Sequence, residues 1–273
     1  MSRPHRKKKP HRRNEAQPKP EPVVMTIRPG AVLRDDDEKQ LVIFSSEMLI
    51  NQLRRDGPSI EASFDRLCDG ELRELSSFLS TTLGMIYTGL KSSIKRDDEL
   101  RSACAQLLLN ASNSFAASVA VLRMGYVLQP GIMIRSLIEA TSTALHLIQH
   151  PVDLAKYKNH TLHSPNTIAA AKTALPPFGQ LYGYFSDNFA HIGRLHKSVT
   201  PLREFTERHE ALNLNLSSLR MAAWLLYVTS ELAFNHLLDE PRYWFPVEGG
   251  FKYDPSAEER TWMSTYFGVS SAA

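Results

Sequence analysis

Apolar residues recur at helical spacing along most of the chain, and the periodic stretches are separated by proline, glycine and short polar segments. An apolar stripe that repeats every three to four residues is typical of an amphipathic helix, whereas a half-buried strand alternates with a period of two. We find no convincing run of the second kind. The pattern therefore predicts an all-α fold, a multi-helix bundle. The predicted helices cover residues 36–55, 59–68, 71–95, 97–125, 130–150, 152–161, 165–175, 177–193, 213–239 and 256–267.

Local signals place the ends of several of these helices. Gly57-Pro58 and Gly70 predict breaks between the first three, because both residue types interrupt helical periodicity. The acidic pair Asp97-Asp98 predicts the start of the fourth helix. Ser164-Pro165 combines a good N-cap with a residue suited to the first helical turn.

Composition divides the chain into three parts. Residues 1–35 are rich in basic residues and proline, which predicts a disordered basic arm and linker. Residues 36–240 hold the long periodic stretches and predict the bundle; with 42% apolar residues, the chain can bury a substantial core. Residues 241–273 contain three prolines and Gly249-Gly250, which predicts an irregular extension with one short helix.

Positive charge is concentrated at the N-terminus. The net charge is +3, yet residues 1–20 hold eight basic residues against Glu15 alone, and the remainder holds 24 basic and 28 acidic residues. A basic run of this kind binds the phosphates of RNA or DNA, contacts an anionic membrane, or only keeps the chain soluble. The candidate nucleic-acid-binding residues are Arg6, Lys7, Lys8, Lys9, Arg12 and Arg13.

We expect a soluble, cytoplasmic protein without a membrane span. Cys68 and Cys104 are the only cysteines, which excludes a disulfide framework and suits a reducing compartment. No apolar segment follows the basic start as it would in a secretory signal. The longest apolar run, 221–228, is far shorter than the roughly 20 residues that a membrane-spanning helix needs.

A polar stripe on the predicted helix 130–150 carries the first candidate site. At 100° per residue, Arg135, Glu139, His146 and His150 share one side of this helix, and an apolar face lies opposite. Helix rise separates Arg135 from His146 by roughly 16 Å, so the stripe consists of two pairs. The first pair, Arg135 and Glu139, is either a solvated ion pair or a buried contact kept for specificity or chemistry.

A second stripe lies on the predicted helix 177–193 and just beyond it, where Tyr184, Asp187, His191 and Arg194 flank the apolar face. Asp187 precedes His191 by four residues, so in a regular helix its carboxylate can hold the imidazole and raise the histidine pKa. Two interpretations remain open. The residues form an Asp–His dyad beside a tyrosine, or they form a surface contact near a helix end.

The two stripes together resemble a known family. The chain has Arg-Ser-Leu-Ile-Glu at 135–139 and Tyr-Phe-Ser-Asp-Asn-Phe-Ala-His at 184–191. This combination resembles a family of uncharacterised bacterial helical proteins that carry Arg-x3-Glu on one helix and Tyr-x-Ser-x4-His on a later one. That family is similar to the HEPN bundles, many of which act on RNA in defence or toxin systems. The resemblance covers about residues 100–240 and implies a polar cleft between two helices. With Asp187 added from the local pairing, the candidate catalytic residues are Arg135, Glu139, Tyr184, Ser186, Asp187 and His191.

Other chemistry has weaker support. HEPN nucleases carry an arginine followed, after four to six residues, by a histidine. Two stretches fit this spacing, Arg6 to His11 and Arg203 to His209. Chance alone predicts about two such stretches in a chain of this composition, so they do not indicate a nuclease. Histidines also occur in three close pairs, which suits metal ligands. These pairs are His146/His150, His160/His163 and His191/His196. We find no phosphate-binding loop, dinucleotide fingerprint or nucleophile elbow, and we expect no cofactor.

The sequence thus predicts a cytoplasmic, nucleic-acid-associated helical protein with a polar cleft. The expected role is in bacterial defence or stress, and HEPN-like RNA processing stays among the possible activities. Two alternatives stay open: a non-enzymatic interaction module with solvated polar faces, and a metal-dependent bundle enzyme that uses the histidine pairs. Whether any reaction is catalysed stays open as well. Trp224, Tyr227 and Phe234 are expected in the core. The aromatic segment 242–245 is expected to pack back on the bundle, with a homodimer contact as the alternative.

Overall fold

A computed structural model describes residues 29–35, 40–192, 194–197 and 201–267 of the chain. The chain forms two units, Met1–Asn51 and Gln52–Ala273. In the first unit, strand β1 (Pro29–Asp35) pairs antiparallel with strand β2 (Gln40–Ser45), and the short helix α1 (Met48–Asn51) follows.

The helix predicted over 36–55 is therefore wrong across residues 40–45, and β1 occupies part of the predicted linker. The segment Gln-Leu-Val-Ile-Phe-Ser is a short apolar run with two β-branched residues. Periodicity alone cannot distinguish such a run from a helix segment, and pairing with β1 decides its conformation.

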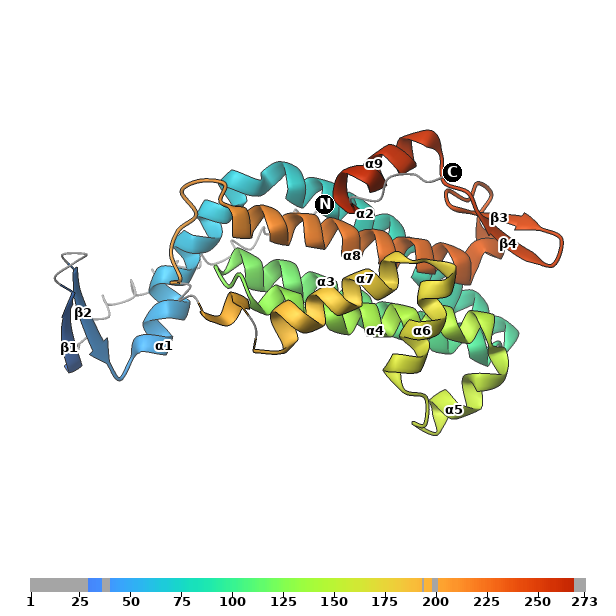
Figure 1. The fold of residues 1–273 in the computed structure, drawn as a ribbon, viewed down its shortest axis with the longest axis horizontal. Helices are drawn as coiled ribbons and strands as arrows, with labels where there is room; N and C mark the ends of the chain where they lie inside the picture. The colour runs from blue at the N-terminus through green and yellow to red at the C-terminus, as the bar shows by residue number, and fades with distance from the viewer. Residues whose placement is uncertain (1–28, 36–39, 193, 198–200, 268–273) are drawn as a thin grey trace, which may run out of the picture. The chain divides into compact units, whose positions relative to one another are not determined.

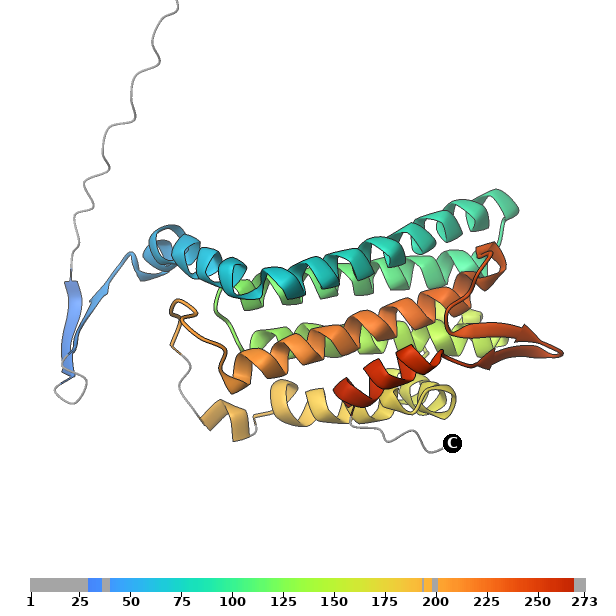
Figure 2. The same cartoon turned by 90° about the horizontal axis from the view of Figure 1, so that it is seen from above.

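The second unit is built on four long helices, which confirms the all-α, multi-helix bundle. These helices are α2 (Gly57–Arg96), α3 (Glu99–Arg123), α4 (Gln129–Gln149) and α8 (Glu210–Phe234). They run side by side in both views of the fold (Figures 1 and 2). Helix α3 contacts the other three, and α8 packs against both α2 and α4. Short connections make α3 an antiparallel neighbour of both α2 and α4. The predicted start of α3 at Asp97-Asp98 is confirmed, because the Asp98 carboxylate accepts the Arg101 N–H at 2.9 Å.

Helix α2 runs through the break that the sequence predicts at Gly70. The helix bends instead at Cys68, whose φ of −122° and ψ of 19° lie outside helical values. Buried Cys68 and Leu75 lie on either side of Gly70. Packing on both sides outweighs the roughly 1 kcal/mol that a glycine costs inside a helix. The pair Gly57-Pro58 begins α2 and follows a π-helical turn, η1 (Gln52–Asp56).

Three shorter helices connect α4 to α8. They are α5 (Leu154–Lys158), α6 (Ser164–Ala174) and α7 (Pro177–Phe185), with the 3₁₀ turns η2 (Pro151–Asp153) and η4 (Arg194–Lys197) between them and the long helices. Helices α6 and α7 pack on α4, and a π-helical turn, η3 (Ser186–Ala190), continues α7. The helix predicted over 177–193 thus ends early, and the residue that caps α6 is His163 rather than Ser164.

Two glycines allow close approach between helices and rings. An added Cβ on Gly89 of α2 would overlap the ring of Phe234 in α8, and one on Gly131 of α4 would overlap the ring of Phe189 in η3. Both rings are buried. The predicted core positions Trp224 and Phe234 are confirmed as fully buried, and Tyr227 is partly buried against the core.

The C-terminal segment is more regular than predicted. After the 3₁₀ turn η5 (Asn235–Leu237), strands β3 (Trp244–Val247) and β4 (Gly250–Tyr253) form an antiparallel hairpin. The predicted short helix is confirmed as α9 (Ala257–Phe267). Proline and glycine led us to predict an irregular segment. Instead, Gly249, with a positive φ of 82°, forms the turn between the two strands.

A buried carboxylate fastens this segment to the bundle. Glu231 of α8 is fully buried, and it accepts the backbone N–H groups of Arg242, Tyr243 and Trp244 at 3.0, 2.6 and 2.7 Å. Burial raises the pKa of Glu231, while the three N–H groups oppose the rise. The side chain of Tyr243 is fully buried and donates its hydroxyl to Glu259 of α9 at 2.5 Å. The prediction that 242–245 packs back on the bundle is confirmed.

Helix α3 is long and apolar enough to cross a membrane, and it is the one candidate among the residues that the structure describes. Helices α2, α4 and α8 pack against it, and part of its surface is buried in the bundle. One such helix is not a clear membrane span.

Candidate functional site

The arginine that the sequence singles out joins α4 to α7 and η3. The Arg135 guanidinium donates to the Ser186 hydroxyl from Nε at 3.1 Å and to the Tyr182 hydroxyl from Nη2 at 2.9 Å. The same Nη2 lies 3.1 Å from Oε1 of Glu139, and the Tyr182 hydroxyl donates to that oxygen at 3.3 Å. Arg135, Glu139, Tyr182 and Ser186 thus form one connected polar group, which we call the Arg135 cluster.

The Arg135 cluster lies at the boundary between core and solvent. The side chains of Arg135 and Glu139 are each 29% exposed, whereas Ser186 is buried. The guanidinium carbon of Arg135 lies 5.1 Å from the centre of the Tyr182 ring, within the range of a cation–π contact. The pair is therefore neither the freely solvated ion pair nor the fully buried contact that the sequence left open.

Local backbone geometry brings Ser186 to the arginine. The chain widens into the π-helical turn at Ser186, where the Ser186 carbonyl accepts the N–H of His191 at 3.0 Å. In the same turn, Phe189 packs against the backbone of α4 at Gly131, where any side chain would displace it. The turn and Gly131 together hold the Ser186 hydroxyl within reach of Nε.

Two predicted partners lie elsewhere. Asp187 and His191 are exposed, and no hydrogen bond joins them among the residues described. The predicted dyad assumes a regular helix, in which residues four apart lie on one face. The π-helical turn breaks that spacing, and His191 has extended backbone angles, φ −101° and ψ 150°. The structure therefore does not bring Asp187 and His191 together as the sequence predicts.

The tyrosine of the cluster is Tyr182 rather than Tyr184. Tyr184 packs its ring edge-on against Phe185 and Phe189, with centroids 5.3 and 5.9 Å away. Tyr182 was missed because the family pattern draws attention to Tyr-x-Ser. Its signal was present in the sequence, since Tyr182 precedes Ser186 by four residues and so shares its helix face, whereas Tyr184 lies about 200° round from Tyr182.

The first predicted histidine pair, His146 and His150, contacts other side chains of the second unit. His146, which the sequence places on a polar stripe, is buried; its Nε2 lies 2.9 Å from Oδ2 of Asp153, and its ring is 4.8 Å from that of His150. Lys156 and His146 together hold the pKa of Asp153 below its usual value. Within the described part of the chain, no three histidine, cysteine, aspartate or glutamate side chains gather as a metal site would require. The metal hypothesis thus has no ligand set among these residues.

The remaining predicted residues are His209, which caps a helix, and the basic residues near the N-terminus. His209 caps α8, with its Nδ1 accepting the Leu212 N–H at 3.2 Å and its ring stacked on Phe205. An acceptor Nδ1 carries no proton, so in this arrangement His209 serves the helix end rather than a nuclease pair with Arg203. The candidate nucleic-acid-binding residues Arg6, Lys7, Lys8, Lys9, Arg12 and Arg13 lie outside the described residues.

Chemically, the Arg135 cluster can orient a hydroxyl or hold an anion. The Nη1 group of Arg135 makes none of the hydrogen bonds found among the described residues, so it can donate to an incoming oxygen. Comparison with known proteins adds no further assignment: no family model, no curated protein and no solved structure matches this chain.

Proposed function

We propose that this protein is a cytoplasmic nucleic-acid-associated protein that binds RNA or DNA through its basic N-terminal segment. The observation that carries the proposal is the charge distribution: eight basic residues and one acidic residue within 1–20, against 24 basic and 28 acidic residues in the rest. A polyanion is attracted to the first segment and repelled by the net charge of the second.

The bundle contributes a folded body and the Arg135 cluster to this function. The family resemblance supports a bacterial defence or stress role in which the cluster contacts RNA. Binding is favoured over catalysis, because a general base must lie within hydrogen-bond reach of the reacting group. Exposed His191 is not bonded to Asp187, and the Arg135 cluster contains no histidine.

The test is a salt titration of binding by the full chain. A fluorescent single-stranded RNA and a DNA duplex are titrated with three proteins: the unchanged chain, a deletion of residues 1–20, and a variant with the six candidate residues changed to glutamine. If the six residues neutralise six phosphates of a single strand, affinity falls by roughly two to three orders of magnitude between 50 and 200 mM salt. Both altered proteins lose most of this dependence.

A control variant removes three positive charges from the bundle instead. Lys91, Lys95 and Lys172 are exposed on α2 and α6, and their change to glutamine alters the net charge without touching the N-terminal segment. This control keeps the steep salt dependence if the proposal holds. Absence of binding at low salt contradicts the proposal and favours a non-enzymatic interaction module. Equal losses from the control and from the N-terminal variants contradict the role proposed for the N-terminal segment.

A further inference from the structure

A groove of about 860 Å³ opens where the end of α4, helix α6 and the β3–β4 hairpin meet. Its size falls within the range of small-molecule sites, roughly 300–1,000 Å³. Ile148 and Arg135 lie 13 residues apart on α4, so the groove is about 20 Å along the helix from the Arg135 cluster. The groove is therefore a separate feature.

One wall of the groove is aromatic because of strand register. Trp244 pairs with Tyr253, and Pro246 pairs with Phe251, so these four side chains point to one face of the hairpin. Trp244 is held firmly, since its indole N–H donates to the Val228 carbonyl at 2.9 Å and its ring lies 5.2 Å from that of Tyr253. Phe251 is the accessible ring of this wall, with 43% of its surface exposed.

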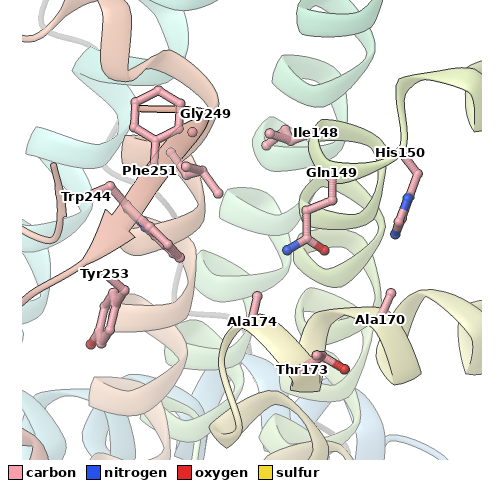
Figure 3. A pocket seen from close by; sticks show the side chains of 12 residues that line it. Ile148, Gln149, His150, Ala170, Thr173, Ala174, Trp244, Gly249, Phe251 and Tyr253 are labelled. Atoms are coloured by element: carbon pink, nitrogen blue, oxygen red, sulfur yellow. The ribbon is translucent and has the colours of Figure 1, made fainter. Parts of the chain in front are cut away.

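The opposite wall carries hydrogen-bonding groups. Gln149 and His150 come from the end of α4, and Thr173 comes from α6; all three are exposed and line the groove. Figure 3 shows the Gln149 amide extending into the space between this wall and the aromatic wall, above Ala174. The small side chains of Ala170 and Ala174 form the floor and leave room for a flat group between the walls.

Charge restricts what can enter. Among the residues that the structure describes, no aspartate, glutamate, lysine or arginine lines the groove. The cations of the neighbouring hairpin and its flanks are already paired, Lys252 with Asp254 at 2.9 Å and Arg242 with Glu259. An ion that entered would lose hydration and, His150 apart, would meet no charged side chain, so an uncharged group fits the groove better.

We infer that this groove binds a nucleobase, stacked on Phe251 and hydrogen-bonded at its edge by Gln149 and Thr173, with any phosphates left in solvent. A base has the required properties: it is flat, uncharged, apolar on its faces and rich in donors and acceptors along its edge. The inference rests on the proposed function, because it names the part of the nucleic acid that the bundle contacts. The base comes from a free nucleoside or from a single strand.

The experiment titrates the full chain with adenosine, uridine, hexa-adenylate, an abasic hexamer and the uncharged alkyl ligand octyl glucoside. Binding is followed by ¹⁵N NMR at the Trp244 indole N–H and by calorimetry. Saturable binding of a nucleoside supports the inference. Hexa-adenylate that binds more tightly than both adenosine and the abasic hexamer identifies a single strand as the source, and equal binding of adenosine and hexa-adenylate identifies the free nucleoside.

The hairpin supplies its own control. Phe251→Ser is expected to weaken adenosine binding by about tenfold, the size of one base–aromatic stack. Phe245 is 40% exposed and pairs with Lys252 on the opposite face, so Phe245→Ser removes a similar ring and leaves affinity unchanged. Gln149→Ala, on the other wall, also weakens binding and leaves the residues of the hairpin unchanged.

Three outcomes overturn the inference: no nucleoside binding, binding of octyl glucoside alone, or equal losses from Phe251→Ser and Phe245→Ser. These experiments distinguish failure of the base-binding inference from failure of the proposed function. Salt-dependent RNA binding without nucleoside binding overturns only the inference that the groove binds a base. Nucleoside binding without salt-dependent RNA binding overturns only the role of the N-terminal segment.

Discussion

Two glycines in helix α2 allow the same substitution to be compared in opposite environments. Gly84 is exposed, and an added Cβ meets no atom within 4 Å. Gly89, five residues later, is buried, and an added Cβ would lie less than 3.0 Å from three atoms of the Phe234 ring. We expect Gly84→Ala to stabilise the protein and Gly89→Ala to destabilise it.

The magnitudes follow from helix propensity and packing. Alanine is favoured over glycine inside a helix by about 0.5–1 kcal/mol, and Gly84→Ala gains this amount in full. Gly89→Ala has the same gain, but its methyl group must displace the ring of Phe234, which is fully buried. Overpacking of this kind costs about 1–3 kcal/mol. The free energies of unfolding of the two variants therefore differ by about 2 kcal/mol.

Urea unfolding followed by circular dichroism measures this difference. With an m-value of about 2 kcal/mol/M, the unfolding midpoints of the two variants separate by about 1 M. A double-mutant cycle with Phe234→Leu tests the cause, because a smaller side chain at 234 relieves the overlap and the two substitutions then cost less together than separately. Equal stability of Gly84→Ala and Gly89→Ala, or additive costs in the cycle, would refute the close approach of α2 and α8.

Three further variants test other contacts by urea unfolding. Arg135→Lys cannot keep the forked contacts of Arg135 and costs about 1–3 kcal/mol; a loss below 0.5 kcal/mol, the size of an ordinary surface change, contradicts the cluster. Glu231→Ala leaves three backbone N–H groups without their acceptor and costs about 3–5 kcal/mol, whereas Glu240→Ala, on an exposed carboxylate nearby, stays within about 0.5 kcal/mol. The Arg208 guanidinium holds the pKa of Glu71 below its usual value, so Glu71 stabilises the fold above its unfolded pKa and this stability is lost as pH falls through the folded pKa. Glu71→Gln therefore loses less stability than the unchanged chain between pH 7 and pH 3, and equal losses would contradict the pairing.

The long helices were predictable because each carries an apolar face over many turns. Helices α3, α4 and α6 begin and end within a few residues of the positions that proline, glycine and acidic residues indicate. The hairpins were not predictable in the same way. Strands β2 and β3 are six and four residues long, too short for a period of two to stand out from a helical one.

The candidate site shows a different limit of sequence patterns. Arg135, Glu139 and Ser186 were predicted to act together, and the structure joins them. Asp187 and His191 follow the start of a π-helical turn, so every angle calculated for them from 3.6 residues per turn is displaced. Nothing in the local sequence marks that turn; the contact of Phe189 with Gly131, 58 residues earlier in the chain, accompanies it.

The pairing of charges within the bundle explains why the basic N-terminal segment remains the better candidate for binding a polyanion. Several arginines of the second unit already face carboxylates on other parts of the bundle: Arg123 with Glu61 and Asp65, Arg208 with Glu71, Arg220 with Glu74, and Arg242 with Glu259. A phosphate would have to displace these carboxylates to reach the arginines, and such an exchange gains little. Residues 1–20 contain one carboxylate for eight cations, so most of their charge has no partner within that segment. We therefore assign the proposed attraction of a polyanion to the N-terminal segment rather than to these arginines.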